Sequence, residues 1–102
     1  MFFFNRPSIN DAIKEFHSTP GAVLLDVREA DEYRSGHIPG AKNVPLSTIQ
    51  TASLPNGLST PLFVYCLSGA RSGRAVNFLK SKGYNKVKNI GGINSYRGSM
   101  EK

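Results

Sequence analysis

The sequence is poor in cysteine and has no apolar run long enough to cross a membrane. Cys66 is the only cysteine in 102 residues, which excludes an intrachain disulfide framework and any metal site built from several cysteines. The apolar stretches fall well short of the roughly 20 residues that a membrane-spanning helix needs, so we expect no membrane association. A single thiol without a secretory signal peptide is typical of a reducing compartment, and we expect a cytoplasmic location.

Acidic residues are scarce in the second half of the chain. Residues 52–102 carry eight basic side chains and a single acid, Glu101, whereas residues 1–51 carry five basic and six acidic side chains. Such a bias suits small anionic substrates, an acidic protein partner or nucleic acid, and a merely solvated basic face is the alternative. We expect no nucleic-acid partner, because no basic run, zinc-ligand spacing or RNA-binding aromatic signature is present.

Strand and helix patterns alternate along the chain and predict an α/β fold with a mainly parallel sheet and helices on both faces. The length suits a single domain covering residues 1–102. Buried or β-rich runs predict strands at residues 22–27, 41–44, 61–65 and 86–90. Helical patterns open at Ser8 and recur at residues 31–35, 45–51 and 72–82. We expect Phe2–Phe4 to pack on the sheet.

The most informative stretch runs from a buried strand through Cys66 and a short turn into a helix. Parallel sheets present their functional groups at the carboxyl ends of strands, where Cys66 lies. Gly69 and Gly73 permit a tightly curled backbone, which would point N–H groups inward beside the positive end of the helix dipole. Such a nest lowers the pKa of a cysteine thiol, and Arg71 and Arg74 add full positive charges. The alternative is that Cys66 is only a small buried apolar residue.

Three motifs resemble the signatures of the rhodanese domain of the sulfurtransferases. Residues 25–29 (Leu-Asp-Val-Arg-Glu) with Tyr33 and the Gly-His-Ile-Pro-Gly-Ala segment at 36–41 resemble the first signature. Residues 66–72 (Cys-Leu-Ser-Gly-Ala-Arg-Ser) resemble the six-residue active-site loop and its cysteine. Residues 89–93 (Asn-Ile-Gly-Gly-Ile) followed by Tyr96 resemble the closing signature, where Trp is more usual at the last place. The motifs stand in the family's order, so the chain is identified as a single-domain member.

The resemblance implies that Cys66 transfers sulfur by covalent catalysis. Its thiolate takes the outer sulfur of a small anionic donor such as thiosulfate, a persulfide or a polysulfide, and an acceptor thiol or cyanide then removes that sulfur. No metal and no organic cofactor is implied, and a protein donor or acceptor is left open. The residues implied to form the substrate-binding loop are Leu67, Ser68, Gly69, Ala70, Arg71 and Ser72.

Charged residues outside the loop are expected to support it. Asp26 and Arg28 close the first strand, either as a structural pair or as substrate ligands. Glu32 and Arg71 are expected to form an ion pair that holds the loop. His37 lies inside a turn motif, so we interpret it as structural rather than as a base for Cys66.

Two other functions are compatible with part of this pattern. Cysteine phosphatases and arsenate reductases of a similar fold place five residues between the cysteine and the arginine, whereas four separate Cys66 from Arg71. A loop one residue shorter should be too tight for phosphate but can hold a single sulfur. A sulfur carrier or regulatory binding module, loaded at Cys66 by a partner enzyme, fits the same motifs, and the basic second half would then offer a docking face.

Overall fold

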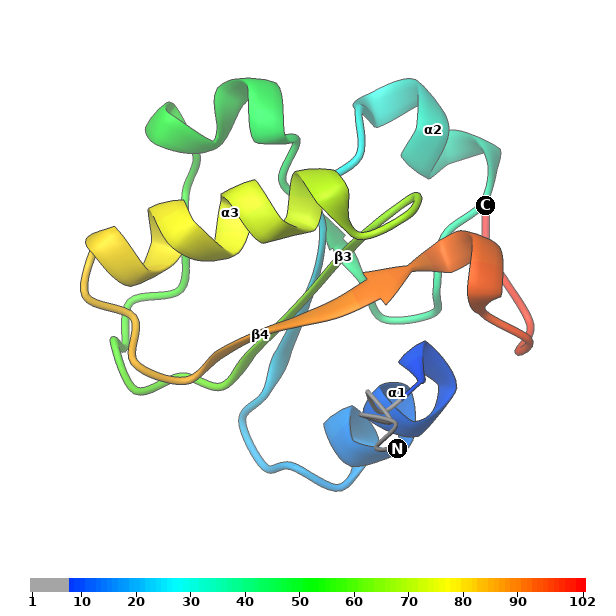
Figure 1. Ribbon diagram of the computed structural model, residues 1–102, viewed down its shortest axis with the longest axis horizontal. Helices are drawn as coiled ribbons and strands as arrows, with labels where there is room; N and C mark the ends of the chain where they lie inside the picture. Colours follow the sequence, from blue (N-terminus) through cyan, green and yellow to red (C-terminus); the bar gives the residue numbers. More distant parts are fainter. Residues whose placement is uncertain (1–7) are drawn as a thin grey trace, which may run out of the picture.

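Four parallel strands form one sheet in the order β2-β1-β3-β4, which confirms the predicted α/β fold (Figure 1). The computed structural model describes residues 8–102, so the prediction for Phe2–Phe4 lies outside the described part of the chain. The strands are β1 (Val23–Asp26), β2 (Lys42–Asn43), β3 (Leu62–Cys66) and β4 (Val87–Gly92). The helices are α1 (Ile9–His17), α2 (Ala30–Ser35) and α3 (Ala70–Ser81), with 3-10 helices η1 (Leu46–Thr51) and η2 (Ile93–Ser95).

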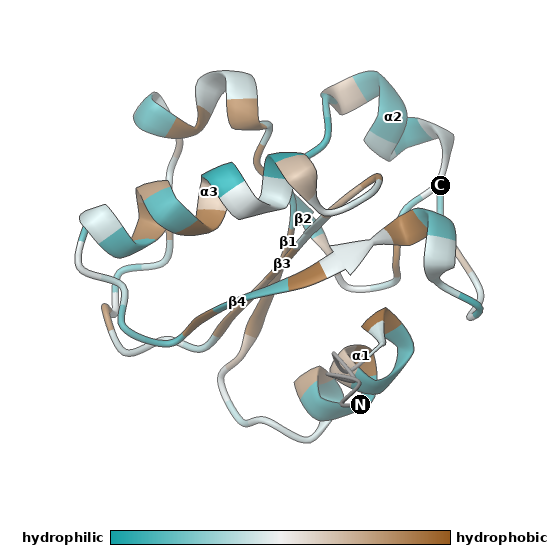
Figure 2. Ribbon diagram, viewed as in Figure 1, coloured by the Kyte–Doolittle hydropathy of each residue, from teal (hydrophilic) through white to brown (hydrophobic). Residues whose placement is uncertain are grey.

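Helices cover both faces of the sheet because successive side chains of each strand point to opposite sides. In β3, the side chains of Leu62, Val64 and Cys66 belong to a core shared with α3 and η1. Phe63 and Tyr65, which alternate with them, belong to a second core shared with α1. Figure 2 shows the apolar colour concentrated along the central strands, while α3 alternates between apolar and polar positions. The whole of β3 is buried, so Cys66, its last residue, is held in a fixed position by the core.

The start of α1 follows its local sequence. The hydroxyl oxygen of Ser8 accepts the backbone N–H of Asp11 at 3.1 Å, which satisfies one of the donors left open at a helix N-terminus. Ile9, Ala12 and Ile13 are buried against the sheet. The predicted opening of a helix at Ser8 is therefore confirmed.

The start of α3 differs from the prediction. The helix begins at Ala70 rather than at Ser72, because Gly69 is the N-cap and adopts φ +106°. Its carbonyl accepts the N–H of Gly73 at 3.1 Å and closes the first turn. Gly73 therefore lies inside the helix and has no left-handed backbone conformation, contrary to our expectation. Because Gly69 is the N-cap, the hydroxyl of Ser72 does not cap the helix. The loop between β3 and α3 consists only of Leu67–Gly69.

Other boundaries shift for local reasons. β4 continues beyond Ile90 to Gly92, with a register irregularity opposite Val64 and Tyr65. Gly91 takes φ +102° there, a conformation that residues with a Cβ rarely adopt. The strand predicted at 41–44 shortens to β2, and the helix predicted at 45–51 is the 3-10 helix η1.

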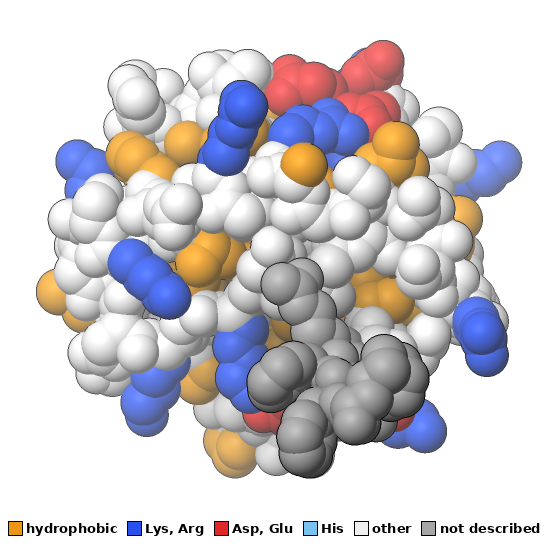
Figure 3. Space-filling view, in the orientation of Figure 1, with side chains coloured by type: hydrophobic (Ala, Val, Ile, Leu, Met, Phe, Trp, Pro, Cys, Tyr) orange, Lys and Arg blue, Asp and Glu red, His pale blue; other side chains and the backbone are white. Residues whose placement is uncertain are grey.

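The surface is charged but not uniformly so. On the face drawn in Figure 3, acidic side chains gather over the region of α2 beside basic ones, while other basic side chains are scattered singly. Within residues 8–102, no helix combines the length and the apolarity that crossing a bilayer requires.

Candidate active site

Cys66 ends β3 at the carboxyl edge of the sheet, and the loop Leu67–Gly69 curls back so that Gly69 contacts Sγ of Cys66. Only 1% of Cys66 is exposed. The backbone N–H of Gly69 donates to Sγ at 3.0 Å, and the left-handed conformation of Gly69 then leads the chain into α3. The curled loop that the sequence predicts at this position is therefore present.

Ser72 lies in the first turn of α3, where backbone N–H groups have no partner within the helix. Its Oγ is 3.3 Å from Sγ of Cys66. Burial alone would raise the pKa of the Cys66 thiol. The hydroxyl and N–H of Ser72, together with the N–H groups of Gly69 and Ser68, outweigh burial and lower that pKa below its ordinary value. The site therefore favours a sulfur anion at a place from which water is largely excluded.

The loop rests directly on the end of β4. A Cβ added to Gly92 would lie 2.2 Å from the carbonyl oxygen of Leu67 and 2.6 Å from Cα of Ser68. The same Leu67 oxygen accepts the N–H of Asn94, in η2, at 3.2 Å. Glycine at position 92 is thus required for the loop to approach this closely, although Gly92 was not among the predicted site residues.

Asn89 on β4 is a second residue that our sequence reasoning did not place at the site. Its Oδ1 accepts the Ser72 hydroxyl at 2.7 Å and the N–H of Gly91 at 3.0 Å. Its Nδ2 donates to the carbonyl of Gly69 at 3.1 Å. The signal that could have identified it is its position at the start of the closing motif, since neighbouring parallel strands end at the same edge of a sheet.

Arg71 and Glu32 form the ion pair that the sequence predicts. Nη1 and Nη2 of Arg71 lie 2.6 Å and 2.9 Å from the two carboxylate oxygens of Glu32. Hydrogen bonding to Arg71 is the main influence that lowers the pKa of Glu32 to about 2. The backbone N–H of Glu29 also donates to Oε1 of Glu32, at 3.0 Å, within the cap of α2. The pair fixes the first turn of α3 to α2 and leaves the charge of Arg71 compensated.

The predicted loop residues differ in how far solvent reaches them. Leu67, Ser68 and Ala70 are exposed, Gly69 and Arg71 are partly buried, and Ser72 is fully buried. Arg74 is exposed one turn further along α3. Sγ of Cys66 therefore lies beneath a loop whose outer side chains carry no charge at positions 67, 68 and 70.

Asp26 and Arg28 are buried together and stabilise the region around β1, β2 and the turn after α2. Nε of Arg28 contacts both Asp26 oxygens at 3.1 Å, and Nη2 donates to the carbonyl of Gly36 at 2.7 Å. Asn43 donates to the carbonyls of both residues. Within residues 8–102, none of these bonds reaches the Cys66 loop, so the pair joins β1, β2 and the turn after α2.

His37 lies apart from Cys66. Its ring stacks on that of Tyr33 with centroids 3.7 Å apart, and its Nδ1 is 2.9 Å from the Tyr33 carbonyl oxygen. The backbone of His37 pairs with Glu101. These contacts agree with the structural interpretation of His37.

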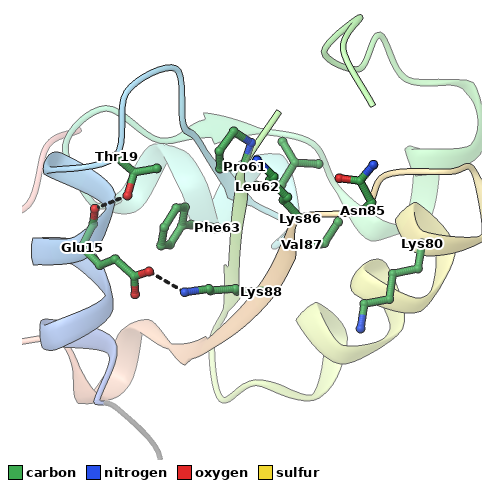
Figure 4. A pocket seen from close by; sticks show the side chains of 10 residues that line it. All are labelled: Glu15, Thr19, Pro61, Leu62, Phe63, Lys80, Asn85, Lys86, Val87 and Lys88. Carbon is green, nitrogen blue, oxygen red and sulfur yellow. Dashed lines mark hydrogen bonds and ion pairs between the residues drawn. The ribbon is translucent and has the colours of Figure 1, made fainter. Parts of the chain in front are cut away.

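A cavity of about 460 Å³ lies at the amino end of β3, away from Cys66. Figure 4 shows the ring of Phe63 in its wall, beside the ion pair between Glu15 and Lys88. Leu62, which begins β3, also lines it, while no residue of the Cys66 loop does. Functional groups gather at the opposite end of β3, so we place the candidate active site at Cys66 rather than in this cavity.

Comparison with known proteins agrees with the motifs. The family model described as "Rhodanese-like domain" matches residues 9–99. The thiosulfate sulfurtransferase PspE of Escherichia coli is 36% identical over 72 residues, which cover 68% of each chain. YqhL of Bacillus subtilis, an uncharacterized protein, is 37% identical over 81 residues, covering 78% of this chain and 64% of YqhL.

YrkF of the same bacterium, whose name proposes a sulfur-carrier role, is 34% identical over 79 residues. That match covers 76% of this chain but only 43% of YrkF. The crystal structure of a rhodanese-like domain protein from Staphylococcus aureus superimposes with a TM-score of 0.79 at 25% identity, covering 92% of this chain and 93% of that one. The chain therefore belongs to the rhodanese-like domain family.

Proposed function

We propose that this protein is a sulfurtransferase that carries sulfane sulfur on Cys66. One observation carries the proposal: Cys66 is only 1% exposed, yet its Sγ accepts the Gly69 N–H at 3.0 Å and lies 3.3 Å from the Ser72 hydroxyl. A buried apolar cysteine has no need of such donors. Fixed dipoles around a sulfur stabilise negative charge that develops there during a reaction.

The chemistry proceeds in two half-reactions. The Cys66 thiolate attacks the outer sulfur of the donor, a new S–S bond forms, and the donor's S–S bond breaks. With thiosulfate, sulfite leaves with the bonding electron pair, and Cys66 becomes a persulfide anion. An acceptor thiolate or cyanide then attacks the terminal sulfur, and the electron pair of the breaking bond returns to Sγ. The acceptor comes from outside, because Cys66 is the only cysteine of the chain.

The arrangement of Arg71 argues against phosphate chemistry. A phosphatase of this type would use its arginine to hold the phosphate oxygens. Both terminal nitrogens of Arg71 instead bind the carboxylate of Glu32. The short loop and the compensated arginine together favour a ligand as small as one sulfur atom.

Mass spectrometry of the protein after incubation with thiosulfate or polysulfide tests the proposal. We expect one added sulfur atom on the peptide that contains Cys66, and its loss after cyanide is added. Cys66→Ser should abolish the adduct and the transfer to cyanide, because a neutral hydroxyl is a poor nucleophile without a base. A Ser variant with full activity would show that the sulfur is carried elsewhere.

A protein-to-protein sulfur carrier is the second candidate, favoured by the similarity to YrkF. The two roles differ in rate. An enzyme should turn over repeatedly with thiosulfate and cyanide, whereas a carrier should be loaded stoichiometrically by a cysteine desulfurase and react slowly with free thiosulfate. Measuring both rates on the same preparation distinguishes them.

A further inference from the structure

The side-chain amide of Asn89 has a fixed orientation. Its Oδ1 accepts the N–H of Gly91 at 3.0 Å, and its Nδ2 donates to the carbonyl of Gly69 at 3.1 Å. In a flipped amide, Nδ2 would face the N–H of Gly91 and Oδ1 would face the carbonyl oxygen of Gly69, and neither pair can form a hydrogen bond. These two backbone groups therefore determine which atom of the amide is the oxygen. The oxygen of Asn89 therefore faces Ser72, 2.7 Å from its Oγ.

Ser72 has one hydroxyl proton and two neighbours that compete for it. Because Oδ1 of Asn89 can only accept, the short contact places the proton toward Asn89. The Ser72 oxygen is then free to accept from the S–H of Cys66, 3.3 Å away. A thiolate has no proton to give, so the Ser72 hydroxyl must turn toward Sγ, and Asn89 then loses that donor.

We propose that Asn89 is a positioning residue for Cys66: it holds the Ser72 proton while Sγ is uncharged and releases it when Sγ is a thiolate. The proposal deepens the proposed function and rests on it. In the transfer cycle Sγ is uncharged in the thiol and as the inner sulfur of the persulfide, and it carries charge before attack and after the acceptor leaves. At each change the Ser72 hydroxyl only rotates and keeps its own proton, while the proton of the Cys66 thiol passes to solvent when the thiolate forms.

Replacing Asn89 by alanine should shift the pH midpoint of Cys66 alkylation downward if Asn89 holds the Ser72 proton, and upward if Asn89 only clamps the loop. Asn89→Ala removes the competing acceptor, so the midpoint of Cys66 alkylation against pH should fall. At a pH below that midpoint the alkylation rate should rise about two- to tenfold, the effect of one neutral hydrogen bond. Asn89→Asp keeps an acceptor and adds negative charge, so the midpoint should rise. Both variants lose the bond to Gly69, so a residue that only clamps the loop would raise the midpoint in both.

The experiment is the rate of iodoacetamide alkylation against pH for the full chain. It compares wild type, Asn89→Ala, Ser72→Ala and the double variant, with Asn77→Ala, an exposed α3 substitution, as control. Without the Ser72 hydroxyl, the Asn89 substitution should no longer lower the midpoint, whereas an equal shift in both backgrounds would overturn the proposal. A lowered midpoint in Asn89→Asp would overturn it as well, which keeps the test decisive if Asn89→Ala does not fold.

The readout separates this proposal from the proposed function. Alkylation needs no sulfur donor, so the coupling between Asn89 and Ser72 can be present in a protein that fails to acquire sulfur, and the reverse also holds. No variant changes the other charged or titratable side chains on the elements next to Cys66, which are Asp26 on β1, Tyr65 on β3, Lys88 on β4, and Arg71, Arg74 and Lys80 on α3. Arg28 and Glu32, which pair with Asp26 and Arg71, are unchanged as well.

Discussion

Replacing Gly92 by alanine should slow sulfur loading of Cys66, although the new Cβ clashes with the loop and not with Cys66 itself. The new Cβ would lie 2.2 Å from the Leu67 carbonyl oxygen and 2.6 Å from Cα of Ser68. Ordinary contacts between heavy atoms lie near 3.5 Å, so the loop must move away by about 1 Å. Such a displacement lengthens the 3.0 Å contact from Gly69 N–H to Sγ and weakens that hydrogen bond. The clash involves backbone on the loop side, so no side-chain rotation relieves it.

We expect Gly92→Ala to lower the rate of sulfur loading by up to about a hundredfold, the effect of a misplacement of this size. It should also raise the pKa of Cys66 and destabilise the fold by about 1–3 kcal/mol. Loading is followed by mass spectrometry, the thiol by alkylation against pH, and stability by urea unfolding.

The matched control is Gly21→Ala. Gly21 has φ +75° and no atom within 4 Å of an added Cβ, so alanine costs about 1–2 kcal/mol of backbone strain far from the loop. This variant should lose comparable stability and keep the wild-type loading rate. If Gly92→Ala loads sulfur as fast as Gly21→Ala, the loop does not depend on its contact with β4.

Other predictions concern the charges and the surface of the loop. Arg71→Ala and Glu32→Ala should slow sulfur loading by similar factors, and the double variant should lose little more; additive losses would show that the pair is not coupled. The pKa of Glu32 is lowered from 4.5 to about 2, so its stabilising effect is present above pH 4.5 and is lost as the pH falls through about 2. The unfolding free energy should decline over that range, and Glu32→Gln should decline less; parallel curves would contradict this. Leu67→Arg should lower KM for thiosulfate with little change in kcat, and an unchanged KM would contradict the interpretation that missing charge at position 67 weakens thiosulfate binding.

Residues whose role depends on neighbours in sequence were predictable. The helix start at Ser8, the continuous apolar run of β3 and Gly69 in the loop after Cys66 act within a few residues, so their patterns indicate local structure directly. The ion pair of Glu32 and Arg71 spans 39 positions, and it was predicted only because the resemblance to the rhodanese family implied that both residues lie near the loop.

The contributions of β4 were harder to predict because they depend on sheet register. Asn89 and Gly92 face the loop only because β3 and β4 lie side by side and an irregularity opposite Val64 and Tyr65 shifts their pairing. A register shift changes which residues face the same neighbour. The helix predicted over residues 72–82 begins two residues earlier, at Ala70, because Gly69 is its N-cap, while the hydroxyl of Ser72 is engaged by Asn89.

The charge balance around Cys66 bears on the donor. Leu67 and Ser68, the first residues after the cysteine, supply no charge, and Arg71 is compensated by Glu32. Negative charge at the sulfur is thus stabilised mainly by backbone N–H groups and one hydroxyl, which suit a single charge more than the doubly charged thiosulfate ion. Each missing charge-assisted hydrogen bond costs about 1.5–3 kcal/mol, or one to two decades of affinity. We therefore expect thiosulfate to bind weakly. A persulfide or polysulfide, which depends less on charge-assisted hydrogen bonds, should be the better donor.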